Sequence, residues 1–173
     1  SYSLTDKELA FVTSNDSLSD SVMNIAQYLT RKKFPRWGGF QDVLLAQGLK
    51  FKQIRDPFIQ VLHTKDPDHW LTVSNIGAPP NSVFVYDSID EDVPPDAVKQ
   101  VCSILKLQLA NINVFVKPAQ SQGGTLDCGL FAIANMYCIA SGKDPTTVSF
   151  RQHSMRTHLL NCLKKGVMTD FPI

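Results

Sequence analysis

The chain has 173 residues, of which 43% are hydrophobic and 19% charged, and its formal net charge is +1. This length fits one domain, 1–173, with a sizeable core, and the balanced charge gives no reason to expect nucleic acid or a membrane as partner. No apolar run approaches the ~20 residues of a membrane span. Because the chain shows neither a signal-peptide pattern nor an initiator methionine, we expect a domain excised from a longer protein.

The first predicted element is a helix over residues 18–33. Val22 and Ile25 recur there at helical spacing, behind serine and aspartate residues suited to capping. Pro35 and the glycine pair that follows it end this helix.

Three strands are predicted next, over residues 58–63, 69–75 and 82–88. Their β-branched and aromatic residues are separated by the short turn-forming stretches KDPD and GAPPN. Connections this short favour antiparallel hairpins. The acidic residues around 90–92 are typical of a solvated turn.

The second half of the chain predicts a helix over 94–109, a strand over 111–117 and two further helices over 128–141 and 154–165. A block of strands with helices at both ends indicates an α+β domain, not a repeated βαβ unit. We therefore expect a central, mostly antiparallel sheet flanked by helices.

The four cysteines form no CxxC pair and no spacing typical of a metal site, so we expect no bound metal. Cys102, Cys138 and Cys162 fall within apolar helical patterns, where a free cysteine behaves as a small hydrophobe. A chain of this length does not need disulfides to stabilise its core. We expect a reduced, intracellular protein, cytoplasmic or nuclear.

Cys128 differs from the other three because it stands where a polar, glycine-containing loop meets an apolar helix. With Asp127 as N-cap, the helix dipole and the free backbone N–H groups would favour a thiolate at Cys128. Gly129 would let a substrate approach the backbone closely. The alternative is a buried cysteine at a helix start, with Asp127 serving only as the cap.

A nucleophilic cysteine needs a base, and the chain has four histidines. His69 opens a strand beside a loop, where a side chain can face a cleft. His63, which ends the preceding strand, is the rival, although a hydrogen-bonded strand-end histidine is its simpler interpretation. His153 and His158 match neither one helical face nor a zinc spacing, and we expect both at the surface.

Two further side chains complete a candidate site. Asp87 ends the strand segment VFVYD, and in an antiparallel neighbour that end could lie beside His69, where the carboxylate would fix the tautomer of the imidazole. Gln122 stands six residues before Cys128, in the loop that must pass over the thiol. Its side-chain amide could donate to an oxyanion alongside the Cys128 backbone N–H.

Taken in order, HW at 69–70, a strand ending in YDS at 86–88 and Gln-x5-Cys within DCG resemble the catalytic domain of the ubiquitin-like proteases. These comprise the SUMO-specific proteases, their NEDD8-cleaving relatives and the wider adenovirus-protease clan, clan CE. The likeness covers roughly residues 5–165. It includes FPRWGGFQD and DCGLFAIAN, which resemble copies of the domain in transposon-derived animal proteins. The resemblance implies the α+β fold of that clan.

The resemblance also implies roles for individual residues. Cys128 matches the nucleophile, His69 the general base, Asp87 the group that orients it and Gln122 the oxyanion residue. Trp70 matches the tryptophan that covers the channel for the modifier's Gly-Gly tail, where a flat side chain leaves room only for glycines.

Two departures from the family pattern affect the binding residues. The family's WLND-like motif is Ser-Leu-Ser-Asp at 17–20. Asp20 then matches the acidic residue that meets the modifier, but the second channel tryptophan is missing and Trp37 is not assigned its role. The glycine pair at 123–124 leaves Gln120 as an alternative to Gln122.

The resemblance predicts a thiol isopeptidase that cleaves after the C-terminal Gly-Gly of ubiquitin, SUMO or NEDD8, acts as a monomer and needs no cofactor. Three alternatives stay open. They are an endopeptidase for a viral or transposon polyprotein, an inactive modifier-binding module, and an acyltransferase of the same clan. The acyltransferase would need a basic pocket, and the only basic runs are 31–33 and 164–165.

Overall fold

The computed structural model describes residues 3–89 and 92–173, and within these ranges it has five α-helices and one five-stranded sheet. The helices are α1 (Asp6–Val12), α2 (Asp20–Lys33), α3 (Pro95–Leu105), α4 (Cys128–Ala140) and α5 (Gln152–Lys165). The strands are β1 (Gly38–Gly39), β2 (Phe58–Lys65), β3 (Asp68–Ser74), β4 (Ser82–Tyr86) and β5 (Asn113–Lys117). Residues 90 and 91 of the predicted acidic turn lie outside the described ranges.

The sheet has the strand order β1-β2-β3-β4-β5. β2, β3 and β4 pair antiparallel, as their short connections predict, but β1 pairs parallel with β2, and β5 parallel with β4. The sheet is therefore mixed, with an antiparallel centre and a parallel pairing at each edge. The reason at the β5 edge is the connection through α3, because a crossover of this length can bring the chain back in the same direction. The α+β class is confirmed.

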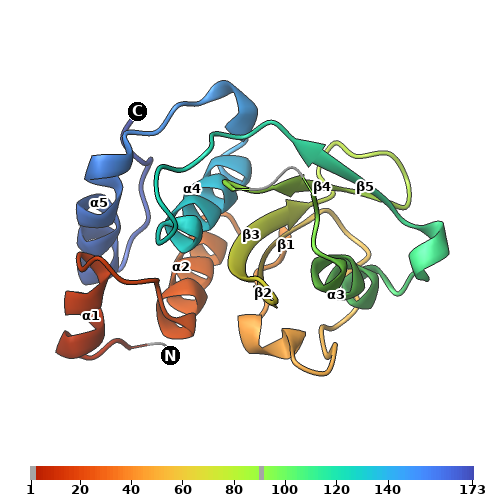
Figure 1. Cartoon of the computed structure of the whole chain (residues 1–173), viewed down its shortest axis with the longest axis horizontal. Coiled ribbons are helices and arrows are strands. Elements are labelled where there is room, and N and C mark those ends of the chain that lie inside the picture. Colours follow the sequence, from red (N-terminus) through yellow and green to blue (C-terminus); the bar gives the residue numbers. More distant parts are fainter. Residues whose placement is uncertain (1–2, 90–91) are drawn as a thin grey trace.

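Each face of the sheet carries a core (Figure 1). Ile59 and Val61 of β2 pack into the larger core with α2, α4 and α5, whereas Phe58 and Leu62 pack into the smaller core with α3. This division follows from the alternation of side chains along a strand.

Helix α4 lies at the centre of the larger core. All thirteen of its residues are buried, in agreement with a sequence that is apolar on every side. The helix packs against β3 and α2, and the Thr72 hydroxyl of β3 donates to the Ala132 carbonyl at 2.7 Å. These contacts hold the first residue of α4 in place relative to β3. Among the described residues, no helix combines the length and apolar character that crossing a bilayer requires.

Two elements were not predicted. Helix α1 has seven residues and begins with a capping box, in which Thr5 and Glu8 exchange side-chain and backbone hydrogen bonds. β1 consists of the glycine pair that was expected only to end a helix. A two-residue strand has no periodicity, so only its partner in the sheet defines it.

Gly39→Ala is expected to lower the free energy of unfolding by about 3 kcal/mol. Gly39 has φ +93°, and a Cβ there would lie 2.0 Å from the Ile59 carbonyl oxygen of β2. Urea unfolding measures the loss. Gly166→Ala is the control, because Gly166 has φ +70° but no atom within 4 Å of a Cβ, so it carries only the backbone penalty of about 1 kcal/mol. Equal losses would show that the contact with β2 adds nothing.

Candidate active site

Cys128 is the first residue of α4, and 5% of it is exposed. The backbone N–H groups in the first turn of a helix lack partners within the helix, and the helix dipole places partial positive charge there. Both effects favour a thiolate and can stabilise an oxyanion formed beside it.

His69 and Asp87 form a buried pair at the start of α4. The His69 Nε2 lies 2.6 Å from Asp87 Oδ1, and the side chains are only 4% and 2% exposed. The Cys128 side chain lies close enough to His69 to raise the pKa of its imidazole. Because Nε2 faces Asp87, Nδ1 is the ring nitrogen left for the sulfur. The structure thus brings together the three residues that the sequence singled out as nucleophile, base and orienting carboxylate.

The charge of His69 is set by two opposing effects. Burial lowers its pKa, but hydrogen bonds to Asp87 and Cys128 and the charges of these groups outweigh burial, and they raise the pKa from 6.5 to about 10. The imidazole at this position is therefore a cation at neutral pH, suited to pair with a thiolate.

Asp87 is held in place by a second donor. Its Oδ1 also accepts the backbone N–H of Ile89 at 2.9 Å, immediately after the end of β4. With the ring on one side and the main chain on the other, the carboxylate has little freedom to turn. A fixed carboxylate determines which ring nitrogen of His69 faces the thiol.

Gln122 and Gln120 occupy different environments in the loop before α4. The Gln122 Oε1 accepts from the Ser88 hydroxyl, its Nε2 donates to the Gly124 carbonyl at 3.1 Å, and its backbone N–H donates to the Ser88 carbonyl at 2.8 Å. By contrast, both ends of the Gln120 amide bind the main chain of Phe150. Gln120 thus anchors the loop. Gln122 carries a second side-chain N–H and is the better candidate for an oxyanion donor.

Trp70 lies beside the start of α4 and is 4% exposed. Its ring stacks on His63, with ring centroids 4.2 Å apart, and a Cβ added at Gly129 would lie 3.2 Å from Trp70 Cδ1. The same Cβ would lie 3.2 Å from Met23 Sδ and 3.3 Å from Leu18 Cβ. The structure thus gives a packing reason for glycine at this position, and the approach of a substrate to its backbone stays a prediction. A glycine is needed there because three buried side chains fill the space.

Asp20 opens α2 and is half-buried. It lines a cavity of about 380 Å³ together with His63, Lys65 and Lys99. This places Asp20 on the Trp70 side of the site, since His63 stacks on that ring. Its contact with a modifier stays a prediction.

Trp37 lies at the far end of α4. Its indole N–H donates to the carbonyl of Ala140, the last residue of that helix, at 2.9 Å. Twelve residues of helix, roughly 18 Å, separate Ala140 from Cys128. Trp37 therefore does not replace the missing channel tryptophan.

The other histidines are accounted for by different contacts. His63 pairs with Asp68 across the β2–β3 hairpin, and His153 is exposed, as expected. His158 lies at the surface but is half-buried. Its Nε2 lies 3.0 Å from the Thr169 carbonyl and its ring packs on Phe171. Within residues 3–89 and 92–173, no group of three His, Cys, Asp or Glu side chains is arranged to hold a metal ion.

Solved structures with a similar fold include the SUMO protease Ulp1 with its catalytic cysteine oxidised to a sulfinic acid. It has a TM-score of 0.72 at 14% identity over 96% of this chain and 86% of that one. A second is the C-terminal Ulp1 protease domain in complex with Smt3, the yeast ortholog of SUMO, with a TM-score of 0.71, 15% identity and coverage of 94% and 83%. The chain has the Ulp1 protease fold.

The Xanthomonas campestris effector XopD bound to ubiquitin has the same fold, with a TM-score of 0.63, 15% identity and coverage of 86% of this chain and 92% of that one. No protein-family model and no curated protein matches this sequence at a significant level. The Ulp1-like fold predicted from the sequence is therefore confirmed, while the likeness to transposon-derived copies stays a prediction.

Sequence reasoning missed two side chains on the α5 side of this Ulp1-like fold. Asp127 occupies the N-cap position of α4, but its carboxylate makes no hydrogen bond to the first-turn amides. Gln152 and Arg156 of α5 bind that carboxylate instead. Gln152 and Arg156 lie more than twenty residues from Asp127 in the sequence, so no local sequence pattern indicates this contact.

Proposed function

We propose that the chain is a thiol isopeptidase that cleaves after the C-terminal Gly-Gly of ubiquitin or a ubiquitin-like modifier. The observation that carries this proposal is the buried His69–Asp87 pair beside Cys128 at the start of α4. The fold supports it further, because similar structures are complexes with Smt3 and with ubiquitin.

The geometry supports the following sequence of steps. The Cys128 thiolate attacks the carbonyl carbon of the terminal glycine, and the helix N–H groups and Gln122 stabilise the resulting oxyanion. The His69 imidazolium then donates its proton to the departing lysine amine as the C–N bond breaks, which leaves a thioester on Cys128. Neutral His69 next takes a proton from water as the water attacks the thioester, and the modifier leaves with a free carboxylate.

Trp70 supports a preference for glycine in the two terminal positions. The side chain lies beside the helix that begins with Cys128, and its position is fixed by the stack on His63 and by contact at Gly129. A rigid flat wall next to the nucleophile favours residues without side chains.

The proposal is tested with ubiquitin, NEDD8 and SUMO that carry an electrophile in place of the terminal carboxylate. We expect a covalent adduct with at least one probe, seen as a mass shift, and none with Cys128→Ala. The probe that reacts identifies the modifier. If a folded protein reacts with none of them, the isopeptidase proposal fails, and a peptide-library cleavage profile then tests the polyprotein endopeptidase.

Gln122→Ala is expected to lower kcat by about 10²-fold, with little change in KM, because the oxyanion donor acts only in the transition state. Turnover of a fluorogenic modifier conjugate measures both constants. Gln120→Ala is the matched control from the same loop, and it should reduce thermal stability more than kcat because it frees Phe150. A larger kcat loss for Gln120→Ala would instead assign the oxyanion role to Gln120.

A further inference from the structure

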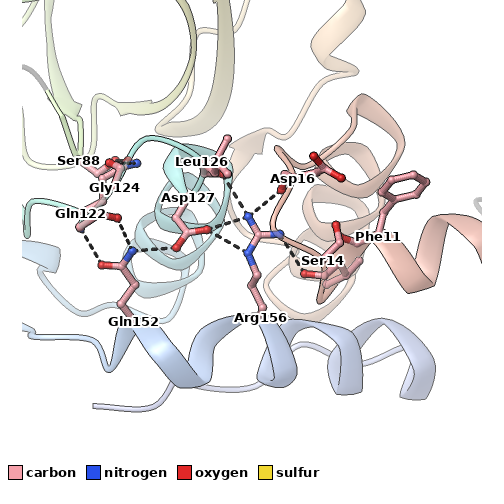
Figure 2. Close-up of polar contacts among 12 residues, drawn as sticks. Phe11, Ser14, Asp16, Ser88, Gln122, Gly124, Leu126, Asp127, Gln152 and Arg156 are labelled. Carbon is pink, nitrogen blue, oxygen red and sulfur yellow. Dashed lines mark hydrogen bonds and ion pairs between the residues drawn. The ribbon is translucent and has the colours of Figure 1, made fainter.

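Two side chains of α5, Gln152 and Arg156, lie one turn apart and bind residues of the loop that precedes Cys128 (Figure 2). Arg156 donates to Asp127 Oδ1 through Nε at 3.0 Å and Nη2 at 2.7 Å, and to the Leu126 carbonyl at 3.2 Å. It also donates to the carbonyl of Val12, the last residue of α1, at 3.1 Å and to that of Asp16, between α1 and α2, at 2.8 Å. One guanidinium thus joins three separate segments.

Gln152 binds the other side of the same carboxylate. Its Nε2 donates to Asp127 Oδ2 at 2.8 Å and to the Gly123 carbonyl at 2.7 Å, while its Oε1 accepts the Gly123 N–H at 2.8 Å. Gly123 directly follows Gln122. The two α5 side chains therefore bind the residue before the nucleophile and the residue after the oxyanion candidate.

The position of Asp127 makes this restraint important. A free carboxylate at an N-cap accepts hydrogen bonds from first-turn N–H groups, which are the donors that an oxyanion beside Cys128 would use. Its negative charge next to the sulfur would also oppose a thiolate. In the structure the carboxylate is turned toward α5, and the guanidinium offsets its charge.

We propose that Arg156 and Gln152 are positioning residues that keep the Asp127 carboxylate off the first-turn amides of α4 and offset its charge, so that Cys128 and the oxyanion donors remain available. This inference rests on the proposed function, since it assigns Cys128 the role of nucleophile. It extends that function to a second layer of side chains, supplied by α5.

The charged groups that face the site come from four elements. His69 lies near the start of β3 and pairs with Asp87, which directly follows β4, while Asp127 precedes Cys128 in the loop and Arg156 approaches from α5. His153 lies on the rim of the hollow that Asp127 and Arg156 also line. Among the described residues, Arg156 is the one cation that forms an ion pair with Asp127, and the side chains of that pair are 14% and 21% exposed.

The test is the pH dependence of Cys128 alkylation by iodoacetamide, followed by mass spectrometry of the Cys128 peptide. Following the Cys128 peptide separates its reaction from that of the other cysteines, of which Cys138 and Cys102 have a pKa that burial raises, to about 11 for Cys138. Arg156→Gln is expected to move the midpoint of the rate profile upward by on the order of one pH unit. The double variant Arg156→Gln with Asp127→Asn should recover most of that shift, because the carboxylate is gone.

A wild-type midpoint in Arg156→Gln would overturn the inference, and so would a double variant that keeps the full shift, since the loss would then be structural. Circular dichroism checks folding. If Arg156→Gln does not fold, Gln152→Ala carries the test. It frees one carboxylate oxygen, and we expect a smaller upward shift and a lower kcat with unchanged KM. No shift in that variant would also contradict the inference.

Alkylation requires no modifier, so the two proposals fail in distinguishable ways. A wild-type protein that shows the expected alkylation profile but reacts with no modifier probe would refute the proposed function and leave the positioning role standing. Reaction with a probe combined with an unshifted Arg156→Gln profile would do the reverse.

Discussion

His69→Gln is expected to slow the reaction of Cys128 with a modifier probe by about 10⁴-fold. The imidazole supplies both the counter-charge for the thiolate and the proton for the leaving amine. Glutamine can occupy much of the same volume, but its amide neither carries a positive charge nor donates a proton to the amine. Single-turnover labelling with the reactive probe measures the rate, and turnover of a conjugate measures kcat.

His63→Gln is the matched control, because His63 was the rival candidate and pairs with Asp68 instead of Asp87. Its kcat should stay within about threefold of wild type, while KM rises through the loss of the stack on Trp70. A kcat loss in this variant as large as in His69→Gln would show that the assignment of the base is wrong.

The same His69 variant gives a stability readout. The folded protein holds the His69 proton up to about pH 10, whereas the unfolded chain releases it near 6.5. Between these values the folded state binds more protons, so raising the pH lowers stability. The contribution is therefore complete below about pH 6.5 and lost by about pH 10. Melting curves across this window should fall more steeply for wild type than for His69→Gln.

Most helices and strands could be predicted because the apolar residues of each recur at the spacing of a helix or of a strand. The strands at 58–65, 68–74 and 82–86 and the helices at 20–33 and 128–140 differ from the predicted bounds by two residues or fewer at each end. The direction of the edge strands could not be predicted in the same way. Strand pairing is a contact between distant segments, and β1 has only two residues to signal it.

In the candidate site, too, local motifs could be predicted from the sequence, whereas contacts between distant segments could not. The sequence order of His69, Asp87, Gln122 and Cys128 could be taken from short motifs, and the structure places both Asp87 and Cys128 next to His69. The packing around Gly129 could not be predicted, because local reasoning considered only the backbone.

The neighbours that decide the roles of Gly129 and Asp127 come from other elements. Leu18, Met23 and Trp70 fill the space at Gly129, and Arg156 approaches Asp127 from α5. None of these lies close in sequence to the residue that it affects, so one sequence without a structure contains no signal for the contacts.

Asp87→Asn is expected to lower kcat by about 10³-fold while KM for a modifier conjugate changes little. Asparagine keeps the shape and can still accept the Ile89 N–H, so the end of β4 should hold its position. What is lost is the negative charge that raises the pKa of His69. Without it, the imidazolium that must protonate the leaving amine is less populated, and the amide can hold the ring in the wrong tautomer.

Asp68→Asn provides the comparison, because the chain contains a second His–Asp pair of the same chemistry. Asp68 pairs with His63, but its side chain is 81% exposed, whereas that of Asp87 is 2% exposed. In water the charge is screened, so removing it should change kcat by less than about twofold. Equal losses in the two variants would mean that kcat responds to charge at this edge of the sheet in general. A loss confined to Asp87→Asn, with an acidic shift in the pH at which activity falls on the alkaline side, would show that Asp87 acts through His69.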